Sequence, residues 1–348
     1  MNSVGGVLVT ARLACGLTQE ELASAVGVTQ AALSRYENGM RDPESEVVGR
    51  LASALGVTAA FLLAAGKLHG AMAVEAHMRR RKTAKPTDWR KLEARLNMYR
   101  LHARYLREEV LLRAEQCVPT FDPIDIPPAD AARLVRMQWR MPVGPAQTLV
   151  QWLEAAGCIV IEEDFRRATR VDGLSQWVDE CPVILLNAHA PTDRKRLTLA
   201  HELGHLCLHS EHVAEDMEDQ ANAFAAEFLM PASTIRPQLR NLSLGRLLDL
   251  KREWGVSVQA LIERAREVRG ITEGQRSSLY KALSYRGWRT AEPISEELLP
   301  ERPRLPEDIG NALASRGLTL REIANLVGVS DADRQHPFRP TGPKLHAV

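Results

Sequence analysis

The chain has 348 residues, of which 45% are hydrophobic and 26% are charged, an ordinary globular composition for two or three domains. Its formal net charge of +1 indicates no class of partner, and its longest apolar run is too short to span a bilayer. The five cysteines show no CxxC spacing, which favours reduced thiols over a disulfide framework. The N-terminus shows no secretory pattern. These features predict a multidomain cytoplasmic protein without membrane association.

Residues 1–66 are predicted to form an all-helical unit. Thr18 to Glu21 (TQEE) is a capping box, which starts a helix directly after Thr18. Gly27 turns the chain into a second short helix over residues 30–37, and a further helix is expected over residues 46–55. Two short helices joined by a tight glycine turn have the geometry of a helix-turn-helix.

The outer face of the second short helix carries side chains suited to DNA. Glutamine bonds bidentately to adenine, Ser and Arg reach bases or phosphates, and Ala or Thr touches a thymine methyl group. The predicted DNA-binding residues on this face are Thr29, Gln30, Ala31, Ser34 and Arg35. Gln19, at the start of the first helix, is placed to contact a phosphate because helix N-termini favour anions. Leu33 and Tyr36 are expected to point inward.

The stretch TQEELASAVGVTQAALSRYENGMRDP strongly resembles the Xre/Cro-type helix-turn-helix family, over about residues 4–64. The resemblance implies a five-helix domain that binds double-stranded DNA and is often dimeric, which makes a homodimer a candidate assembly. Charge leaves a second interpretation open. Residues 1–66 carry four Arg against six acidic residues, and phosphate neutralisation supplies most DNA affinity. A helical bundle used only for protein contact is therefore the alternative.

Residues 67–127 are predicted to form a basic helical linker. Between residues 67 and 116 there are 13 Lys and Arg against six acidic residues, a net charge of +7. These charges either add to DNA affinity or form a solvated helical face. A cluster of prolines then marks a domain boundary: Pro119, Pro123, Pro127 and Pro128.

Helical and strand patterns mix over residues 128–237, which predicts a mixed α+β domain. The expected elements are helices over 129–139 and 144–156 and apolar strands over 158–162 (CIVIE) and 182–186 (PVILL). The stretch TLAHELGHLCLHS follows the second strand and contains the pattern His-Glu-x-x-His.

His201 and His205 lie four residues apart, so on a helix they share one face and can bind one zinc ion. Glu202 lies beside them, placed to act as general base on the metal-bound water. The helix is apolar almost all round, which predicts that it is buried. Gly204, inside the motif, weakens a helix, and the close approach of another element would explain it.

A third ligand must come from another segment. His209 continues the same stripe, but two helical turns, about 12 Å, separate it from His201. It is therefore expected to contact a ligand from the second shell or to line the substrate site. The next helix, EDQANAFAAEFLMP, offers Glu218, with Asn222 one turn later to orient a ligand histidine. Glu227 is the competitor, about 180° away on the helical wheel, and Glu218 is preferred.

VILLNAHAPTDRKRLTLAHELGHLCLHS and EDQANAFAAEFLMP look like the ImmA/IrrE family of metallopeptidases, as do flanking stretches over roughly residues 128–300. The resemblance implies a zincin-like core with a gluzincin-type site. In that site His201, His205 and Glu218 hold Zn²⁺ and Glu202 is the base. It also implies cleavage of Xre-type repressors that control stress or mobile-element genes. Because a repressor-like domain is fused here, the substrate is either another repressor or the chain's own N-terminal domain.

The sequence therefore predicts a transcriptional regulator with zinc-dependent endopeptidase activity. Its fold is an all-α helix-turn-helix domain plus a mixed α+β zincin-like domain with a helical C-terminal extension. The expected divisions are 1–66, 67–127, 128–237, a helical region over 238–333 and a flexible tail over 334–348. The alternative function is that of a DNA-binding repressor or antitoxin-like protein whose peptidase fold is a non-catalytic sensor or scaffold.

The segment GLTLREIANLVGVSDAD, residues 317–333, echoes TQEELASAVGVTQAA near the N-terminus. It is either a second helix-turn-helix or a helical pair that packs on the peptidase. Its second half lacks a convincing recognition helix, so packing is the preferred interpretation.

Overall fold

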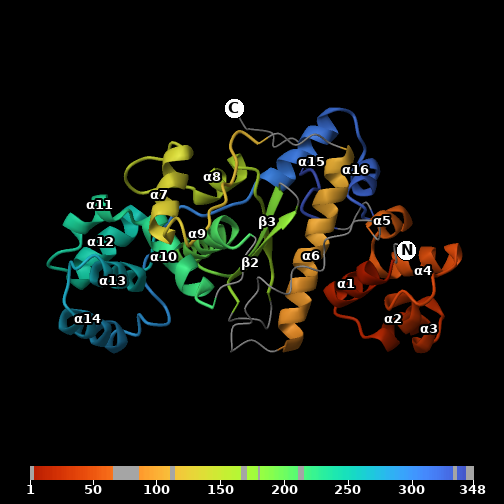
Figure 1. Cartoon of the computed structure of the whole chain (residues 1–348), viewed down its shortest axis with the longest axis horizontal. Coiled ribbons are helices and arrows are strands. Elements are labelled where there is room, and N and C mark those ends of the chain that lie inside the picture. The colour runs from red at the N-terminus through yellow and green to blue at the C-terminus, as the bar shows by residue number, and fades with distance from the viewer. Residues whose placement is uncertain are drawn as a thin grey trace.

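The computed structural model describes residues 4–65, 86–109, 114–165, 171–178, 181–210, 215–331 and 335–341. Figure 1 shows a helical unit at one end, a small sheet flanked by helices in the middle and a further group of helices at the other end. Within the described ranges, no helix is long and apolar enough to cross a membrane.

The N-terminal unit contains five helices, as the resemblance implied. They are α1 (Gly5–Cys15), α2 (Gln19–Val26), α3 (Gln30–Glu37), α4 (Ser45–Leu55) and α5 (Ala59–Ala65). The predicted capping box is present, because the Thr18 side chain accepts a hydrogen bond from the Glu21 N–H and Glu21 reciprocates. Gly27 ends α2 in the left-handed region, at φ 68°. Leu33 and Tyr36 are buried, which leaves the opposite face of α3 outward.

A mixed three-stranded sheet forms the centre of the molecule, with the order β1-β3-β2. Its strands are β1 (Ile159–Glu163), β2 (Gly173–Val178) and β3 (Cys181–Asn187). β1 pairs with β3 in parallel, and β2 pairs with β3 antiparallel. The sequence analysis expected β1 and β3 but not β2, because the polar pair Ser175-Gln176 interrupts its apolar pattern.

Helices cover both faces of this sheet. One face packs on α8 (Leu149–Ala155) and α9 (Thr192–Leu208), and α7 (Pro128–Gln138) and α10 (Met217–Leu229) pack on α9 in the same cluster. The other packs on α6 (Pro86–Glu109), α15 (Leu305–Ser315) and α16 (Leu320–Leu326). Alternate strand residues point to opposite faces, so Val160 and Ile184 join the first cluster while Ile161 and Leu185 join the second.

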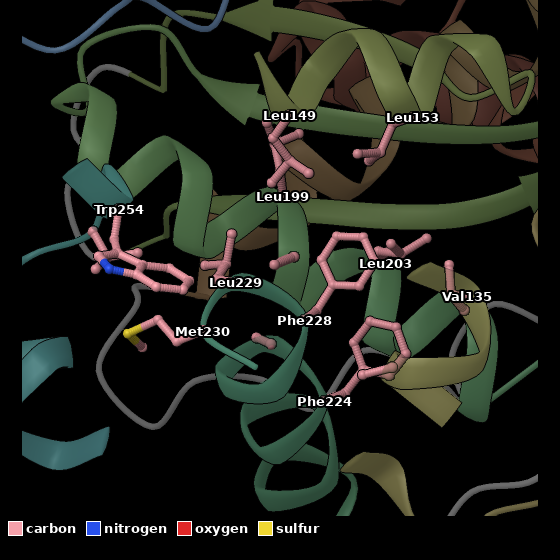
Figure 2. Close-up of a cluster of buried hydrophobic side chains, with 14 of the residues drawn as sticks. Val135, Leu149, Leu153, Leu199, Leu203, Phe224, Phe228, Leu229, Met230 and Trp254 are labelled. Atoms are coloured by element: carbon pink, nitrogen blue, oxygen red, sulfur yellow. The ribbon is translucent and has the colours of Figure 1, made fainter. Parts of the chain in front are cut away.

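The core beneath α9 is the largest of the buried clusters (Figure 2). Phe224 and Phe228 of α10 stack with ring centroids 5.6 Å apart. Leu203 of α9 and Val135 of α7 lie beside them in the same cluster. Because α9 is buried on nearly every side, its position relative to α10 is fixed by packing, as its apolar sequence predicted.

α6 lies between the N-terminal unit and the sheet. Leu92 and Leu96 pack with the sheet, whereas Met98 and Leu101 pack with α1–α5. Arg95 forms an ion pair with Glu163 of β1. The described part of the expected basic linker is thus a packed central helix rather than a solvated face. The basic residues before Pro86 lie outside the described residues.

The C-terminal helices extend the same core. They are α11 (Ala232–Ile235), a 3₁₀ turn (Arg236–Gln238), α12 (Leu244–Trp254), α13 (Val258–Glu267) and α14 (Glu273–Tyr285). Leu247 and Trp254 of α12 share a buried cluster with α9, so the division expected at residue 237 falls inside one core. The tail expected to be loose is packed over residues 335–341, where Phe338 is only 1% exposed.

Two buried networks of ion pairs join the first turns of α9 to the C-terminal segment. Arg196 pairs with Glu301, which also accepts hydrogen bonds from the Leu149 and Val150 N–H groups at the start of α8. Lys251 of α12 is fully buried and contacts Asp193 at 2.6 Å and also Glu292. These networks satisfy the buried charges and hold α9 in place.

Glu154 of α8 makes the fold sensitive to pH. Its carboxylate accepts hydrogen bonds of 2.8 Å from the N–H groups of Arg304 and Leu305, and burial raises the pKa of Glu154 to about 7. The folded-state pKa lies above the unfolded value of 4.5, so this group's stabilisation is fully present below pH 4.5 and is lost as the pH rises through about 7. We expect Glu154→Gln to flatten the fall in the free energy of unfolding over that interval, measured by urea denaturation. An unchanged pH dependence would contradict this assignment.

Candidate functional site

Two histidines of α9 present their ring nitrogens to one point. The Nε2 atoms of His201 and His205 lie 3.0 Å apart, and the rings meet edge to face. Their four-residue spacing places both on the face of α9 that meets α10. His201 is 9% exposed, so its imidazole is largely shielded from water.

Glu218, in the first turn of α10, faces both histidines. Its Oε2 lies 3.6 Å from the Nε2 of His201, and its Oε1 lies 3.6 Å from the Nε2 of His205. Within the described residues, these three side chains form a cluster in which the candidate ligand atoms lie within 4.8 Å of one another.

This cluster fits a tetrahedral zinc ion. Metal–ligand bonds of about 2.0–2.2 Å at tetrahedral angles place neighbouring ligand atoms about 3.3–3.6 Å apart. The carboxylate oxygens lie 3.6 Å from the histidine Nε2 atoms, within this range, and the two nitrogens lie slightly closer together, at 3.0 Å. Two imidazole nitrogens and one carboxylate oxygen also match the donor set of catalytic zinc sites.

Polar partners behind the histidines set their tautomers. The Nδ1 of His201 lies 3.0 Å from the Oδ1 of Asn222. Because an amide oxygen only accepts, this Nδ1 must donate its proton, which leaves Nε2 of a neutral imidazole free to bind metal. Asn222 therefore contacts one of the two candidate ligand histidines.

His209 lies behind the second histidine. α9 ends at Leu208, and the Nδ1 of His209 lies 3.0 Å from the Nδ1 of His205. The Nε2 of His209 lies 2.9 Å from the Oε1 of Gln220, which fixes Nε2 as the donor and Nδ1 as the acceptor. His205 then donates through Nδ1 and keeps Nε2 free. Gln220 was missed by the sequence analysis, although it shares a helix with Glu218.

Glu202 is held from the sheet side. The Oγ of Ser175 on β2 donates to the Oε2 of Glu202 at 2.7 Å. A Cβ atom at Gly173 would lie 2.4 Å from the Cγ2 of Thr198, so glycine lets β2 approach α9 closely. Ser175 was missed with its strand, because only the pairing of β2 with β3 brings it to Glu202.

Gly204 has the role predicted for it. A Cβ atom at this position would lie 3.2 Å from both the Cα of Ala221 and the Cδ1 of Phe224. The absence of a side chain lets α9 and α10 come close enough for Glu218 to reach the histidines. A glycine that is unfavourable for the helix is thus explained by packing.

Glu227, the competing third ligand, has other partners. It is 3% exposed, forms an ion pair with Arg264 and lies 3.1 Å from Arg133. It also accepts from the Ala232 N–H at 3.3 Å. Its carboxylate is therefore part of a buried network that joins α7, α10 and α13, on the side of α10 away from Glu218.

The predicted DNA-binding residues gather on α3, at the outer edge of the N-terminal unit (Figure 1). Thr29, Gln30, Ala31 and Arg35 are exposed, and Ser34 is half-buried. The Thr29 hydroxyl already accepts a hydrogen bond from the Ala32 N–H, so it caps α3. The Ser34 hydroxyl accepts a hydrogen bond of 3.4 Å from the Asn38 amide, and the exposed Gln30, Ala31 and Arg35 side chains are those placed to meet a groove.

Gln19 lies at the start of α2, but its side chain is occupied. Its amide donates to Glu37 at 2.7 Å, and Glu37 forms a buried ion pair with Arg12 at 2.6 Å. The phosphate contact expected of this side chain would require it to leave Glu37. The unpaired backbone N–H groups of the first turn of α2 offer that contact more directly.

Two family models match separate parts of the chain. Residues 8–62 match the model described as "Helix-turn-helix". Residues 153–266, which include His201, His205 and Glu218, match the Peptidase_M78 model, described as "IrrE N-terminal-like domain". No curated protein matches the chain. The chain is therefore a fusion of a helix-turn-helix domain with an IrrE N-terminal-like domain of the peptidase type.

Proposed function

We propose that this chain is a DNA-binding regulator with zinc-dependent endopeptidase activity. The observation that carries the proposal is the cluster of His201, His205 and Glu218, in which both histidines donate through Nδ1, to Asn222 and to His209, and so keep Nε2 unprotonated. Histidines with a purely structural role would not need both Nε2 atoms unprotonated and directed at one carboxylate. The match of residues 153–266 to a peptidase family supports the same function.

The site's own residues supply the remaining chemistry. Bound zinc would lower the pKa of a coordinated water and polarise the scissile carbonyl. Glu202 is one residue from a ligand and is held through Oε2 by Ser175, which leaves its other oxygen to take the proton from the attacking water. The same carboxyl then delivers that proton to the leaving amine.

The substrate we propose is an Xre-type repressor, either another protein or the chain's own N-terminal domain. The helix-turn-helix match supports this class of substrate. The chain's own DNA-binding domain belongs to the same class of protein as the proposed substrate, and both would bind DNA. Cleavage would then relieve repression of stress or mobile-element genes. New protein N-termini that appear in cells with the wild-type chain but not in cells with Glu202→Gln would identify this substrate.

DNA binding through α3 gives a separate test. The double variant Gln30→Ala, Arg35→Ala is expected to weaken specific DNA binding at least about 30-fold, because each lost base contact costs about 1–3 kcal/mol. Fluorescence anisotropy on genomic fragments recovered with the chain measures this affinity. Arg266→Ala, an exposed arginine on α13, serves as the control for lost charge. Equal affinities for all three proteins would favour a bundle used only for protein contact.

A further inference from the structure

The helix-turn-helix domain touches the C-terminal helix pair through two short turns. Val57 and Val329 form an isolated antiparallel bridge. The Thr58 N–H donates to the Gly328 carbonyl at 2.9 Å, and the Ser330 N–H donates to the Gly56 carbonyl at 3.3 Å. Each turn therefore gives one hydrogen bond and receives one.

The two turns are alike in sequence and conformation. ALGVT follows α4 and LVGVS follows α16. Gly56 has φ 74° and Gly328 has φ 78°, and each is followed by Val and a hydroxyl residue. A two-fold contact between identical copies has this reciprocity, in which residue i meets j and j meets i. The turn over residues 328–330 thus takes the place that the turn over residues 56–58 of a second copy would take in a two-fold contact.

An apolar face of the domain is covered by this contact. Val57 is 3% exposed and Phe61 is fully buried. The Phe61 ring lies over Gly328, where a Cβ atom would be 2.3 Å from its Cδ2, and it stacks on His102 of α6 with ring centroids 4.5 Å apart. If α16 moved away, Val57 and one side of Phe61 would meet water, an exposure that favours a new apolar partner.

We propose that α16 and the turn over residues 328–330 stand in for a second helix-turn-helix domain. While they are docked, the Val57–Phe61 face is covered and the chain carries a single DNA-reading unit. When they undock, this face pairs with the same face of a second copy of the chain. The resulting dimer would present two α3 helices to half-sites about one helical turn of DNA apart.

Matched glycine substitutions in the full chain test this proposal. Gly328→Ala places a methyl group against Phe61 and opens the contact, whereas Gly317→Ala, at φ 93°, adds the same left-handed strain where a Cβ would meet no described atom within 4 Å. Sedimentation velocity over a range of concentrations should show the Gly328→Ala chain dimerising at least about 10-fold more tightly than wild type and Gly317→Ala. Hydrogen exchange at residues 57–62 should rise in Gly328→Ala alone.

Two further variants keep the test decisive. Val329→Asp opens the contact without altering a left-handed residue and should also promote dimers. Adding Phe61→Glu to Gly328→Ala should return the chain to the monomer. The proposal is overturned if exchange rises at residues 57–62 while the chain stays monomeric. It is equally overturned if Phe61→Glu leaves the dimer of the Gly328→Ala chain unchanged.

Discussion

Glu202→Gln should lower the rate of peptide cleavage at least about 100-fold while metal binding persists, because general-base catalysis contributes about 10²–10⁴-fold. Glutamine keeps the shape of the side chain and its hydrogen bond from Ser175, but it cannot accept the proton of the attacking water. Cleavage assays and metal analysis on the same preparations separate the two effects.

The control for this substitution is Asp219→Asn, which removes an exposed carboxylate one residue after Glu218. It should cleave at the wild-type rate. If Glu202→Gln also cleaves at the wild-type rate, the peptidase mechanism is wrong. The class of function then becomes that of a DNA-binding repressor or antitoxin-like protein with a non-catalytic sensor or scaffold.

Glu218→Gln should lower zinc affinity and leave the fold stable, whereas Glu227→Gln should lower stability and leave zinc affinity unchanged. Loss of the Glu218 carboxylate removes one of three ligands, so zinc affinity should fall at least about 100-fold, beyond the 10–100-fold typical of outer-shell changes. The fold should survive, since Glu218 is half-buried at the edge of α10. Equilibrium dialysis with zinc measures the affinity.

Glu227→Gln should instead destabilise the fold by up to about 3–5 kcal/mol, because it breaks the buried pair with Arg264 and leaves that guanidinium only the exposed Glu267, 2.8 Å away, as a counter-charge. Its zinc affinity, measured on folded protein, should stay within a few-fold of wild type. Urea denaturation gives the change in stability. Zinc loss in Glu227→Gln with zinc retained in Glu218→Gln would reverse the assignment of the third ligand.

Local rules predicted much of this fold. The capping box after Thr18, the glycine turn at Gly27 and the apolar runs of β1 and β3 each carry their signal within a few residues. The metal cluster was also accessible, since helical spacing alone places His201 beside His205. Gly204 indicated the close approach of another element, which the packing of α10 on α9 confirms.

What the sequence did not reveal depends on tertiary contacts. Ser175 reaches Glu202 only because an unremarkable polar strand pairs antiparallel with β3. Gln220 meets His209 across two helices, a contact that no spacing within one helix predicts. α6 has the composition of a solvated basic helix, yet its apolar residues divide between two cores.

The buried position of α6 has a functional consequence. It contacts α1 of the DNA-binding domain on one side and the sheet that carries Ser175 on the other. A movement of the helix-turn-helix domain would therefore displace α6, which lies between that domain and the sheet next to the candidate metal site.

The central claim is that the metal cluster cleaves protein substrates. Its most direct test compares new protein N-termini in cells that express the wild-type chain with those in cells that express Glu202→Gln. The account predicts N-termini within a helix-turn-helix repressor, or within residues 1–127 of this chain, that appear only with the wild type. Identical sets of N-termini in the two cell populations would contradict it.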